Sequence, residues 1–414
     1  MIELSEALGF VLSRCTPAEP TQMPIDEALG CVIAESISSS EQVPPFANTA
    51  MDGFAVRAVD TIGAEGEPVS LRIVGTVRAG MSGLDSPVGP GQAARIMTGA
   101  PMPPGADAVV MVERTEVTDD GATVLIAAEV PTGNHVRPPG DDIEPGDLVI
   151  AVGTPLTAAH LGVLATVGVT HVTVHPRPRV GVISTGDELI DDGSPLAPGQ
   201  IRDSNRLTLR ALLRTSGFEA IDLGLVRDDE SAIEEALLAG VERCDAIVTS
   251  GGVSMGDFDL IKVVLDRIGD MRWMQIAIKP AKPLAFGTIT RGADGIGVPV
   301  FGLPGNPVSS MVSFELFCRP GLRRMSGFAT DALQRPTVTA IAAEPLGRRP
   351  DGKTHFARVR CEYDQREAIY RVRSSGAQGS HHMAAMAAAD ALAILPDGPT
   401  IEVGDAVQVL LLAP

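Results

Sequence analysis

Aromatic residues are scarce in this sequence. They make up 3% of its 414 residues, although 44% of the residues are hydrophobic, so the cores must be built from Ala, Val, Leu and Ile. The five cysteines form no close pair, which excludes a disulfide framework and a zinc ribbon. No uncharged apolar run is long enough to span a bilayer, and Glu3 and Glu6 stand where a signal peptide carries lysines. We therefore expect a globular, cytoplasmic protein.

Positive charge is also scarce. Lys and Arg number 33 against 52 Asp and Glu, which gives a formal net charge of −19. Such a chain repels nucleic acid and anionic membranes at long range, so neither is expected as a partner. A small anionic ligand would need a local group of cations or a bound divalent metal. The 44 glycines and 32 prolines favour β-rich or α/β domains over helical bundles.

The chain is too long for a single core, so we expect several domains. Helical spacing appears at 2–15 and 157–168, and short strands alternate with turns between these two segments. Strands then alternate with helices, an order that predicts a doubly wound parallel sheet. The predicted parts are a helical linker or dimerisation domain (1–24 and 143–176), an inserted β-rich domain (25–142), an α/β domain (177–328) and a C-terminal β-barrel-like domain (329–414).

Acids and glycines follow several predicted strands of the α/β domain. The stretches are "STGDEL" (184–189), "RDD" (227–229), "VTSGGVSMGDFD" (248–259) and "LPGNPVSS" (303–310). Ligands of such sheets bind beyond the carboxyl ends of the strands, where glycine amides and helix N-termini favour phosphate. Lys279 and Lys282 in "IKPAKP" supply local cations. This pattern predicts Mg²⁺ bridging carboxylates and an anionic ligand.

Each of these features also has an ordinary structural interpretation. Gly251 and Gly252 could form only a tight turn. Asp187 and Glu188 could be solvated turn acids or caps. Asp203, at least one of Asp228 and Asp229, and either Asp257 or Asp259 could cap helices, because acids are favoured at helix N-termini, and the two lysines could be surface residues. Adjacent histidines on a strand point to opposite faces, so no metal site is expected at the His-His pair of "GSHHMAAM". The coincidence of the acids, glycines and lysines at one sheet edge favours the functional interpretation.

Several long motifs occur together in one order along the chain. They are "NTAMDGFAVR", "RIMTGAPMPPGADAVVMVE", "GDDI", "STGDEL", "SGGVSMGDFD", "IKPAKPLAFG", "LPGNPVSS" and "GSHHMAAMAAADALAILP". In this the chain resembles the MoeA family over nearly its whole length. That family comprises molybdopterin molybdenumtransferases with a MogA-like central domain, and it is related to the C-terminal domain of gephyrin.

The resemblance implies a reaction and an assembly. Molybdenum from molybdate would enter adenylylated molybdopterin, with Mg²⁺-dependent cleavage of the adenylate and release of AMP. The resemblance also implies an elongated homodimer whose site lies between the α/β domain of one subunit and the β-rich domain of the other. A MogA-type enzyme and molybdoenzymes would be its further partners.

Site residues are carried over from the family motifs, position by position. Those implied in catalysis are Asp52, Thr98, Asp142, Lys279, Lys282 and Arg358, with Asp52 and Asp142 coming from the partner subunit. Those implied in binding the pterin and its phosphates are Thr185, Gly186, Ser250, Gly251, Gly252, Ser254, Pro304, Gly305, Asn306, Ser309 and Ser380. Those implied in holding Mg²⁺ are Asp187, Glu188, Asp228, Asp257 and Asp259. The three cations Lys279, Lys282 and Arg358 would bind molybdate or the pterin phosphate.

The sequence departs from the family pattern at four positions. Thr49 and Asp141 are chemically mild replacements for Ser and Glu. Ala385 and Asp390 stand where Ser and Asn are common, so they remove a hydroxyl and add a charge near the expected molybdate pocket.

Two other functions stay open at this point. A MogA-type adenylyltransferase shares the α/β domain, but it would resemble 177–325 alone and would usually carry Thr-Gly after "SGG". A gephyrin-like scaffold without catalysis is the other alternative, although no fused partner domain or long linker is apparent.

Overall fold

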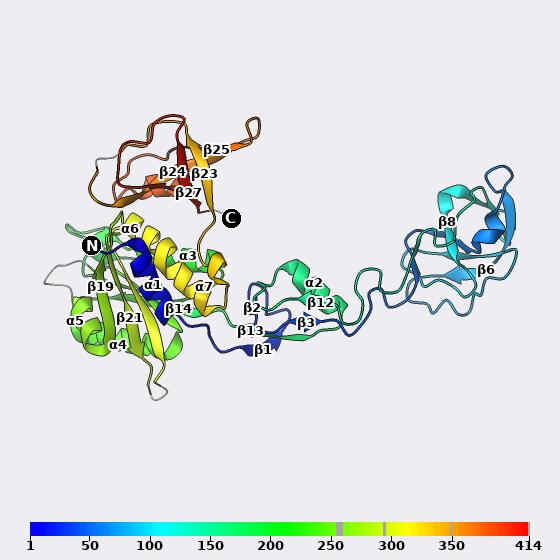
Figure 1. The fold of residues 1–414 in the computed structure, drawn as a ribbon. Coiled ribbons are helices and arrows are strands. Elements are labelled where there is room, and N and C mark those ends of the chain that lie inside the picture. Colours follow the sequence, from blue (N-terminus) through cyan, green and yellow to red (C-terminus); the bar gives the residue numbers. More distant parts are fainter. Residues whose placement is uncertain (254–259, 293–294, 348–349, 413–414) are drawn as a thin grey trace.

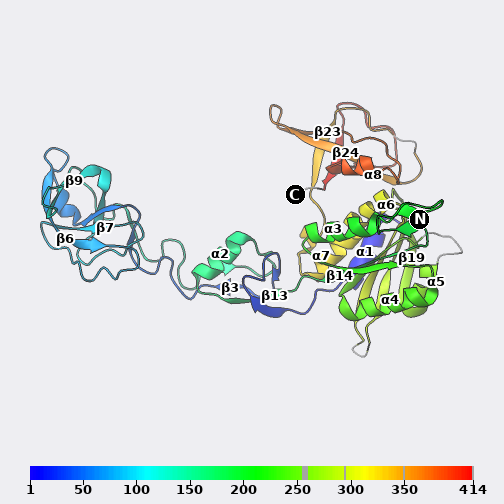
Figure 2. The same ribbon diagram turned by 180° about the vertical axis from the view of Figure 1, so that it is seen from behind.

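The computed structural model describes residues 1–253, 260–292, 295–347 and 350–412, and they form an elongated chain. Figure 1 shows the α/β domain and the C-terminal domain stacked at one end and the inserted β-rich domain at the other. The view from behind shows the same separation, with a slender middle part between them (Figure 2). No described helix has the length and apolar character needed to cross a membrane.

The α/β domain is built on a six-stranded sheet of order β17-β14-β18-β22-β21-β19. Its strands are β14 (Arg179–Thr185), β17 (Glu219–Val226), β18 (Ala246–Ser250), β19 (Gly269–Gln275), β21 (Pro283–Thr290) and β22 (Gly297–Leu303). A separate pair beside this sheet consists of β15 (Leu189–Ile190) and β16 (Ile201–Arg202). The sequence predicted a parallel sheet, but β21 runs antiparallel to both of its neighbours. The connection 291–296 is too short for a parallel crossover, so β21 and β22 form a hairpin.

Helices cover both faces of this sheet, as the alternation of strands and helices predicted. One face carries α1 (Leu4–Arg14), α3 (Asn205–Thr215) and the continuous helical run α6 (Pro307–Ser313), η3 (Phe314–Cys318) and α7 (Arg319–Met325). The other face carries α4 (Glu230–Arg243) and α5 (Leu260–Ile268). Successive strand residues serve opposite faces, since Val182 lies in the first core and Ile183 in the second.

Helix α1 differs from its predicted place in a helical linker domain. Its Ala7 and Val11 are fully buried in the core of the α/β domain, and the Phe10 ring meets Phe286 edge-on at 5.9 Å between ring centroids. The apolar stripe of α1 therefore packs against the sheet of the α/β domain. The second helix predicted for the linker domain, at 157–168, does not pack with it. Periodicity identified the apolar face of α1 correctly but could not show which partner covers it.

The middle part is a small β structure with one helix. A three-stranded sheet is formed by β1 (Thr21–Pro24), β13 (His171–His175) and β2 (Val32–Ile33), and β3 (Ile37–Ser38) pairs with β12 (Leu148–Ile150). Helix α2 (Ala158–Thr166) begins with a capping box between Thr157 and His160. Its Leu164 packs with Ile33 and Val172 in a separate core. Two chain passages thus connect the α/β domain with the inserted domain.

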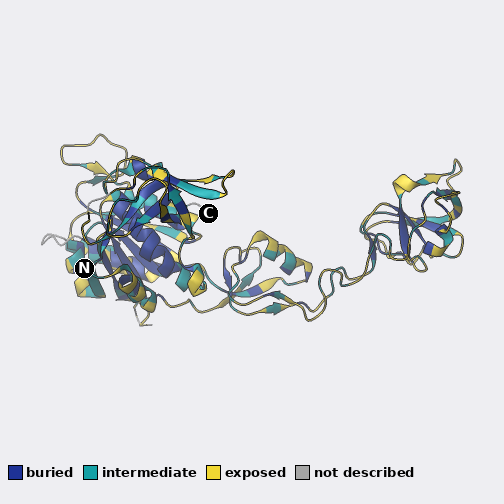
Figure 3. Cartoon of the chain, turned by 45° about the horizontal axis from the view of Figure 1, so that its top comes forward, coloured by how far each residue is buried: buried dark blue, intermediate teal, exposed yellow. Residues whose placement is uncertain are grey.

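The inserted domain contains a six-stranded sheet of order β8-β5-β7-β6-β10-β9, which agrees with its predicted β-rich character. Its elements are β4 (Asn48–Thr49), β5 (Gly53–Val56), η1 (Ala58–Thr61), β6 (Val69–Val77), β7 (Gln92–Ile96), β8 (Ala108–Met111), η2 (Val112–Arg114), β9 (Thr115–Val117), β10 (Thr123–Ile126) and β11 (Val136–Arg137). Its apolar residues form cores of their own, and Figure 3 shows the buried residues gathered here and in the α/β domain.

The C-terminal domain is a closed barrel, as predicted. Its elements are η4 (Thr330–Ala332), β23 (Thr337–Ala342), β24 (Thr354–Asp364), β25 (Ile369–Ser374), α8 (Met383–Ala387), β26 (Ala391–Leu395) and β27 (Ala406–Leu411). The sheet closes because β24 pairs with both β25 and β26. A strand of the α/β segment, β20 (Ile278–Lys279), pairs in parallel with β24 and joins the two domains.

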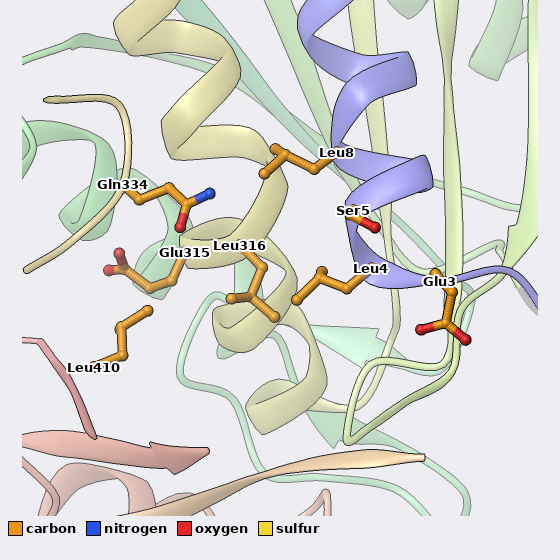
Figure 4. A pocket seen from close by; sticks show the side chains of 8 residues that line it. All are labelled: Glu3, Leu4, Ser5, Leu8, Glu315, Leu316, Gln334 and Leu410. Carbon is orange, nitrogen blue, oxygen red and sulfur yellow. The ribbon is translucent and has the colours of Figure 1, made fainter. Parts of the chain in front are cut away.

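A small apolar pocket of about 300 Å³ marks a second junction between these two domains (Figure 4). Leu4 and Leu8 of α1 face Leu316 of the helical run, and Leu410 of the barrel closes the pocket from below. The barrel therefore contacts the α/β domain both through paired backbone and through side-chain packing.

Candidate functional site

The carboxyl ends of β14, β18 and β22 surround a cavity of about 620 Å³, here called the edge cavity. The loops that follow these three strands supply most of its wall. Its lining residues are Thr185, Gly186, Glu188, Ile201, Asp228, Gly251, Gly252, Val253, Leu260, Pro283, Pro304, Gly305 and Asn306. The sequence motifs predicted to share one sheet edge therefore do meet there.

The glycines of the β18 loop are required by the backbone. Gly251 and Gly252 have φ values of +95° and +73°, a region that residues with a side chain rarely adopt. The Gly251 N–H donates to the Leu303 carbonyl at 3.0 Å, which ties this loop to the end of β22. The tight-turn interpretation is thus correct, and it is compatible with phosphate binding because the loop borders the cavity.

Asn205 was missed by the sequence reasoning. Its Nδ2 donates to the Ser250 hydroxyl at 2.8 Å and to the Gly305 carbonyl at 2.7 Å. Asn205 at the start of α3 therefore fixes the spacing of two loops that wall the cavity. An asparagine three residues after the short strand β16, in "RDSNR", was the available signal.

The acids at this edge have distinct surroundings. The backbone N–H of Asp228 donates to the Asp187 carboxylate at 3.3 Å, and that of Asp187 donates to the Asp228 carboxylate at 3.4 Å. This reciprocal pair joins the loops after β14 and β17. Asp229 caps α4, because its carboxylate accepts from the Ala232 N–H at 2.9 Å. Asp203 is an internal ion-pair partner of Arg206 at 3.0 Å, with only 1% of its side chain exposed.

The donor set at the edge cavity fits Mg²⁺ bound together with a ligand. Glu188 and Asp228 both line the cavity. Mg²⁺ in proteins typically takes one or two carboxylates and completes its shell with water and substrate phosphates. Within the part of the chain that the structure describes, no three His, Cys, Asp or Glu side chains form a metal cage by themselves. Three predicted residues, Ser254, Asp257 and Asp259, lie outside the described residues.

A second cavity of about 610 Å³, the junction cavity, lies between β20 and the C-terminal barrel. Its lining residues are Lys279, Pro280, Gly347, Asp351, His355, Phe356, Ala357, Arg358, Gln378, Gly379 and Leu395. The parallel pairing of Lys279 with His355 brings the predicted lysine to the same cavity as the predicted arginine. Lys279 and Arg358 line the same cavity only because the barrel packs against the α/β domain.

Arg358 is buried and held by the loop around it. It is 1% exposed, and its Nη2 donates to the carbonyls of Ala377 and Gly379, both at 3.0 Å. Gln378 bonds both the backbone N–H and the carbonyl of Arg358. The Nε of Arg358 has no hydrogen-bond partner, and burial lowers the pKa of the guanidinium. A buried cation with an unused donor at a cavity is suited to bind an anion.

The remaining residues predicted in this region lie around the two cavities. Lys282 is exposed, lines neither of them, and lies in the segment that runs from Lys279 to Pro283 of the edge cavity. Ser250 is 3% exposed and bonds Asn205. Ser309 is 4% exposed on α6 and lines neither cavity.

Ser380 connects the barrel with the helix that follows β22. Its carbonyl accepts from the Val308 N–H at 3.1 Å, at the start of α6. Two of the four departures from the family pattern, Ala385 and Asp390, do not line the junction cavity. The Asp390 carboxylate accepts from the Cys361 N–H at 2.7 Å, and the Ala385 carbonyl accepts from the Ser375 hydroxyl.

Two of the predicted residues of the inserted domain form a polar pair. The Asp52 carboxylate accepts from both the backbone N–H and the hydroxyl of Thr98, each at 2.7 Å. These two bonds, the backbone one first, lower the pKa of Asp52 although the side chain is exposed. Asp142 is exposed, and its N–H donates to the Val43 carbonyl at 2.9 Å.

The inserted domain, which carries Asp52 and Thr98, lies at the opposite end of the chain from the α/β domain and the C-terminal barrel (Figure 1). Asp52, Thr98 and Asp142 line neither the edge cavity nor the junction cavity. Within a single chain, the predicted residues of the α/β domain and the barrel therefore come together around the two cavities. The predicted residues Asp52, Thr98 and Asp142 do not join them.

Family models match the chain in three consecutive blocks. Residues 2–168 match the MoeA N-terminal region (domain I and II), residues 181–324 match a probable molybdopterin binding domain, and residues 339–412 match the MoeA C-terminal region (domain IV).

Whole-length relatives agree with these blocks. A molybdopterin molybdenumtransferase of Haemophilus influenzae is 36% identical over 397 residues, covering 95% of this chain and 94% of the relative. Gephyrin of Dictyostelium discoideum is 33% identical over 457 residues, covering all of this chain and 62% of gephyrin. The crystal structure of a molybdopterin biosynthesis MoeA protein from Pyrococcus horikoshii matches over 100% of both chains, with a TM-score of 0.76 and 32% identity.

Proposed function

The chain belongs to the MoeA family, and from this premise we propose that it is a molybdopterin molybdenumtransferase that inserts molybdenum from molybdate into adenylylated molybdopterin. The adenylate is cleaved in a Mg²⁺-dependent step and AMP is released. One observation carries this proposal: the edge cavity and the junction cavity, each fitted for an anion, are connected by the short segment from Lys279 to Pro283.

The edge cavity suits the diphosphate of the adenylylated pterin. The glycines Gly251 and Gly305 expose their backbone to the edge cavity, since they have no side chain to cover it. Asn205 fixes the spacing between the two loops that contain them. Glu188 and Asp228 would hold Mg²⁺ on the phosphate oxygens. The bound ion would supply neutralisation of the charge on those oxygens. Since cleavage of a phosphoanhydride depends mainly on positioning and charge neutralisation, these side chains need only bind and orient.

The junction cavity suits a second anion. Arg358 presents a buried guanidinium whose Nε is unpaired, and Lys279 adds an ammonium from the strand opposite. We assign this cavity to molybdate or the pterin phosphate, with Lys282 reaching in from the connecting segment. The two cations would keep the anion next to the bond that is cleaved and offset the net negative charge of the chain at short range.

A homodimer would complete the site. The Asp52–Thr98 pair has short hydrogen bonds but lies away from both cavities of its own chain. A two-fold assembly of elongated chains allows the inserted domain of one subunit to reach the cavities of the other. Asp52, Thr98 and Asp142 of the partner would then face the substrate. Phe46 and Met51, which precede Asp52 in the chain, are exposed and provide apolar surface for such a contact.

The proposal also has a cellular setting. A MogA-type enzyme would supply the adenylylated pterin, and molybdoenzymes would receive the product. All five cysteines are free, which supports a reducing cytoplasm.

The test is a defined turnover experiment with purified protein. Adenylylated molybdopterin, molybdate and Mg²⁺ are supplied, and AMP and pterin-bound molybdenum are measured together. We expect equal amounts of both products, and neither when Mg²⁺ is omitted. Consumption of ATP with molybdopterin would favour an adenylyltransferase, and binding of partners without turnover would favour a scaffold.

A further inference from the structure

A third cavity, of about 790 Å³, lies where α7 meets the linker to the C-terminal barrel, and it is here called the arginine cavity. Its lining residues are Arg319, Arg323, Thr330, Asp331, Ala332, Gln334, Arg335, Pro336 and Thr337. None of them lines the edge cavity or the junction cavity. The proposed molybdenum transfer leaves this group of three arginines unexplained.

Each guanidinium is already held in place. Arg319 Nη1 donates to the Leu333 carbonyl at 3.2 Å, and Arg323 Nε donates to the Ala332 carbonyl at 2.7 Å. The Arg323 guanidinium also stacks on the Phe328 ring, 3.6 Å from its centroid. Both carbonyls belong to the linker, so a ligand held by these arginines would bind α7 and the linker at once.

Arg335 is fixed through a carboxylate. Its Nε and Nη2 bond the two oxygens of Glu315 at 3.0 and 3.2 Å, and Glu315 is 3% exposed. Glu315 and Gln334 also line the apolar pocket of Figure 4. Gln334 therefore lines both spaces, and Glu315 connects Arg335 with the pocket between α1 and the barrel.

Positive charge exceeds negative charge at these arginines. The carboxylate of Glu315 pairs with Arg335, but among the described residues no carboxylate lies within ion-pair distance of Arg319 or Arg323. Arg319 is 7% exposed, and its Nε has no hydrogen-bond partner. Burial, followed by the charges of Arg335 and Arg323, lowers the pKa of Arg319 to about 10. An unpaired, buried cation is costly unless an anion joins it.

We propose that the arginine cavity binds a phosphate-class oxyanion, either inorganic phosphate or the phosphate of an ester, between Arg319 and Arg323. Guanidinium groups bind phosphate through paired hydrogen bonds. Because these side chains are ordered before binding, little conformational entropy remains to be lost. The hydroxyls of Thr330 and Thr337 and the amide of Gln334 line the same cavity and can donate to further oxygens. The exposed carboxylate of Asp331 lines it too and disfavours a large polyanion.

The bound anion would stiffen the joint between two domains. Arg319 and Arg323 belong to α7, whereas the carbonyls that they bond belong to the chain that leads into β23. An anion bound to both arginines relieves their mutual repulsion. It therefore favours the state in which both arginines bond the carbonyls of the linker. We expect phosphate to stabilise the contact between the α/β domain and the barrel.

The location is tested by soaking crystals of the full chain in selenate and measuring anomalous density. The expected result is a peak between the guanidinium groups of Arg319 and Arg323. Anomalous peaks at the edge or junction cavity, with none at the arginine cavity, would overturn the proposal. Phosphate and AMP, each tested for displacement of the selenate, distinguish a free anion from a phosphate ester.

Variants test whether the cations bind the anion or only support the fold. Arg323→Gln is expected to lower phosphate affinity at this site at least about tenfold, the factor expected when a charged hydrogen bond is lost. Arg324→Gln is the matched control, because Arg324 is the next residue of α7 and does not line the cavity. It is expected to leave phosphate binding unchanged. Equal losses in the two variants would contradict a specific site.

Arg319→Met separates ligand binding from structural support by the melting temperature. We expect it to melt no lower than the original chain without phosphate, since a buried, repelled cation is removed. It should also lose the rise in Tm that phosphate produces at the site. A lower Tm at every phosphate concentration, with the rise intact, would overturn the proposal. So would a change in dimer dissociation without any effect on phosphate binding, because a partner's carboxylate would then fill the cavity.

Discussion

The α/β domain and the inserted β-rich domain both carry acids in turn-rich motifs, but they present them differently. In the α/β domain, Glu188 and Asp228 line a cavity that is built entirely from their own chain. In the inserted domain, Asp52 is held by two hydrogen bonds of 2.7 Å and yet is exposed and does not line that cavity. Its role in the site therefore depends on the proposed homodimer, in which the substrate would lie on the partner subunit.

The two regions differ in whether one chain supplies the whole binding surface. The first region can bind its ligand from the loops after parallel strands, as open α/β sheets generally do. The second has a polar pair and exposed apolar side chains, and in the proposed homodimer a partner subunit would cover it. The predictions below test this division of the site between two regions, beginning with the largest effect.

Lys279→Ala should remove most of the activity without unfolding the chain. Loss of one preorganised charge donor typically costs about 10²–10³ in kcat. Lys279 is exposed at the end of β20, so its truncation leaves no buried cavity. Single-turnover release of AMP measures the loss, and an unchanged Tm shows that the fold is intact. Lys262→Ala is the control. Lys262 belongs to α5, its ammonium group lies over the ring of Trp273, and it lines neither cavity. Equal activity of the two variants would contradict the assignment.

Mixed dimers test whether the two regions complete each other across subunits. Asp52→Ala and Lys279→Ala are each expected to be nearly inactive alone. After the two variants are mixed and exchanged, about a quarter of the original activity should return, since half of the dimers are mixed and each has one intact site. No recovery, with subunit exchange confirmed by mass, would mean that one chain makes the whole site.

Asn205→Ala should weaken the α/β region from within. It removes the donor shared by the Ser250 hydroxyl and the Gly305 carbonyl, at a cost of about 1–3 kcal/mol in the free energy of unfolding. Activity should fall as well, because the two loops lose their fixed spacing. Gln408→Ala is the control, as it removes a bond of 2.8 Å to Thr339 on the exposed barrel surface. Urea unfolding and turnover measure both effects. Full activity in Asn205→Ala would show that the loops hold their positions alone.

Thr98→Val should have the smallest effect, a rise in the pKa of Asp52. The Thr98 N–H and hydroxyl both lower that pKa, and the variant keeps only the N–H. Because the folded pKa lies below the unfolded one, the contribution of Asp52 to stability is complete above about pH 4. It is lost as the pH falls through the lowered pKa, and the variant should lose it at a higher pH.

An NMR titration of the Asp52 carboxyl group measures this shift. Asp120 provides the internal control, since its pKa is lowered by Thr118 in the same domain and should not change. An unchanged pKa of Asp52 would mean that the Thr98 hydroxyl does not bond it in solution.

Much of the architecture could be predicted from local patterns. Apolar spacing gave the apolar face of α1, and alternation of strands with helices gave the two-sided sheet. The edge cavity could also be predicted, because loops after parallel strands converge at one edge whatever the strand order. The direction of β21 could have been inferred from the short connection before β22, but strand alternation alone suggested a parallel sheet.

The sequence by itself determined the fold class, the family and the group of acids and glycines at the sheet edge, because all three depend on residue types at short spacing. Only the tertiary structure decided that Arg358 is buried beside Lys279, that Asn205 joins two loops, and that Asp52 lies far from both. These facts depend on contacts between residues up to hundreds of positions apart. No local pattern encodes such contacts, since they arise when separate cores pack against one another.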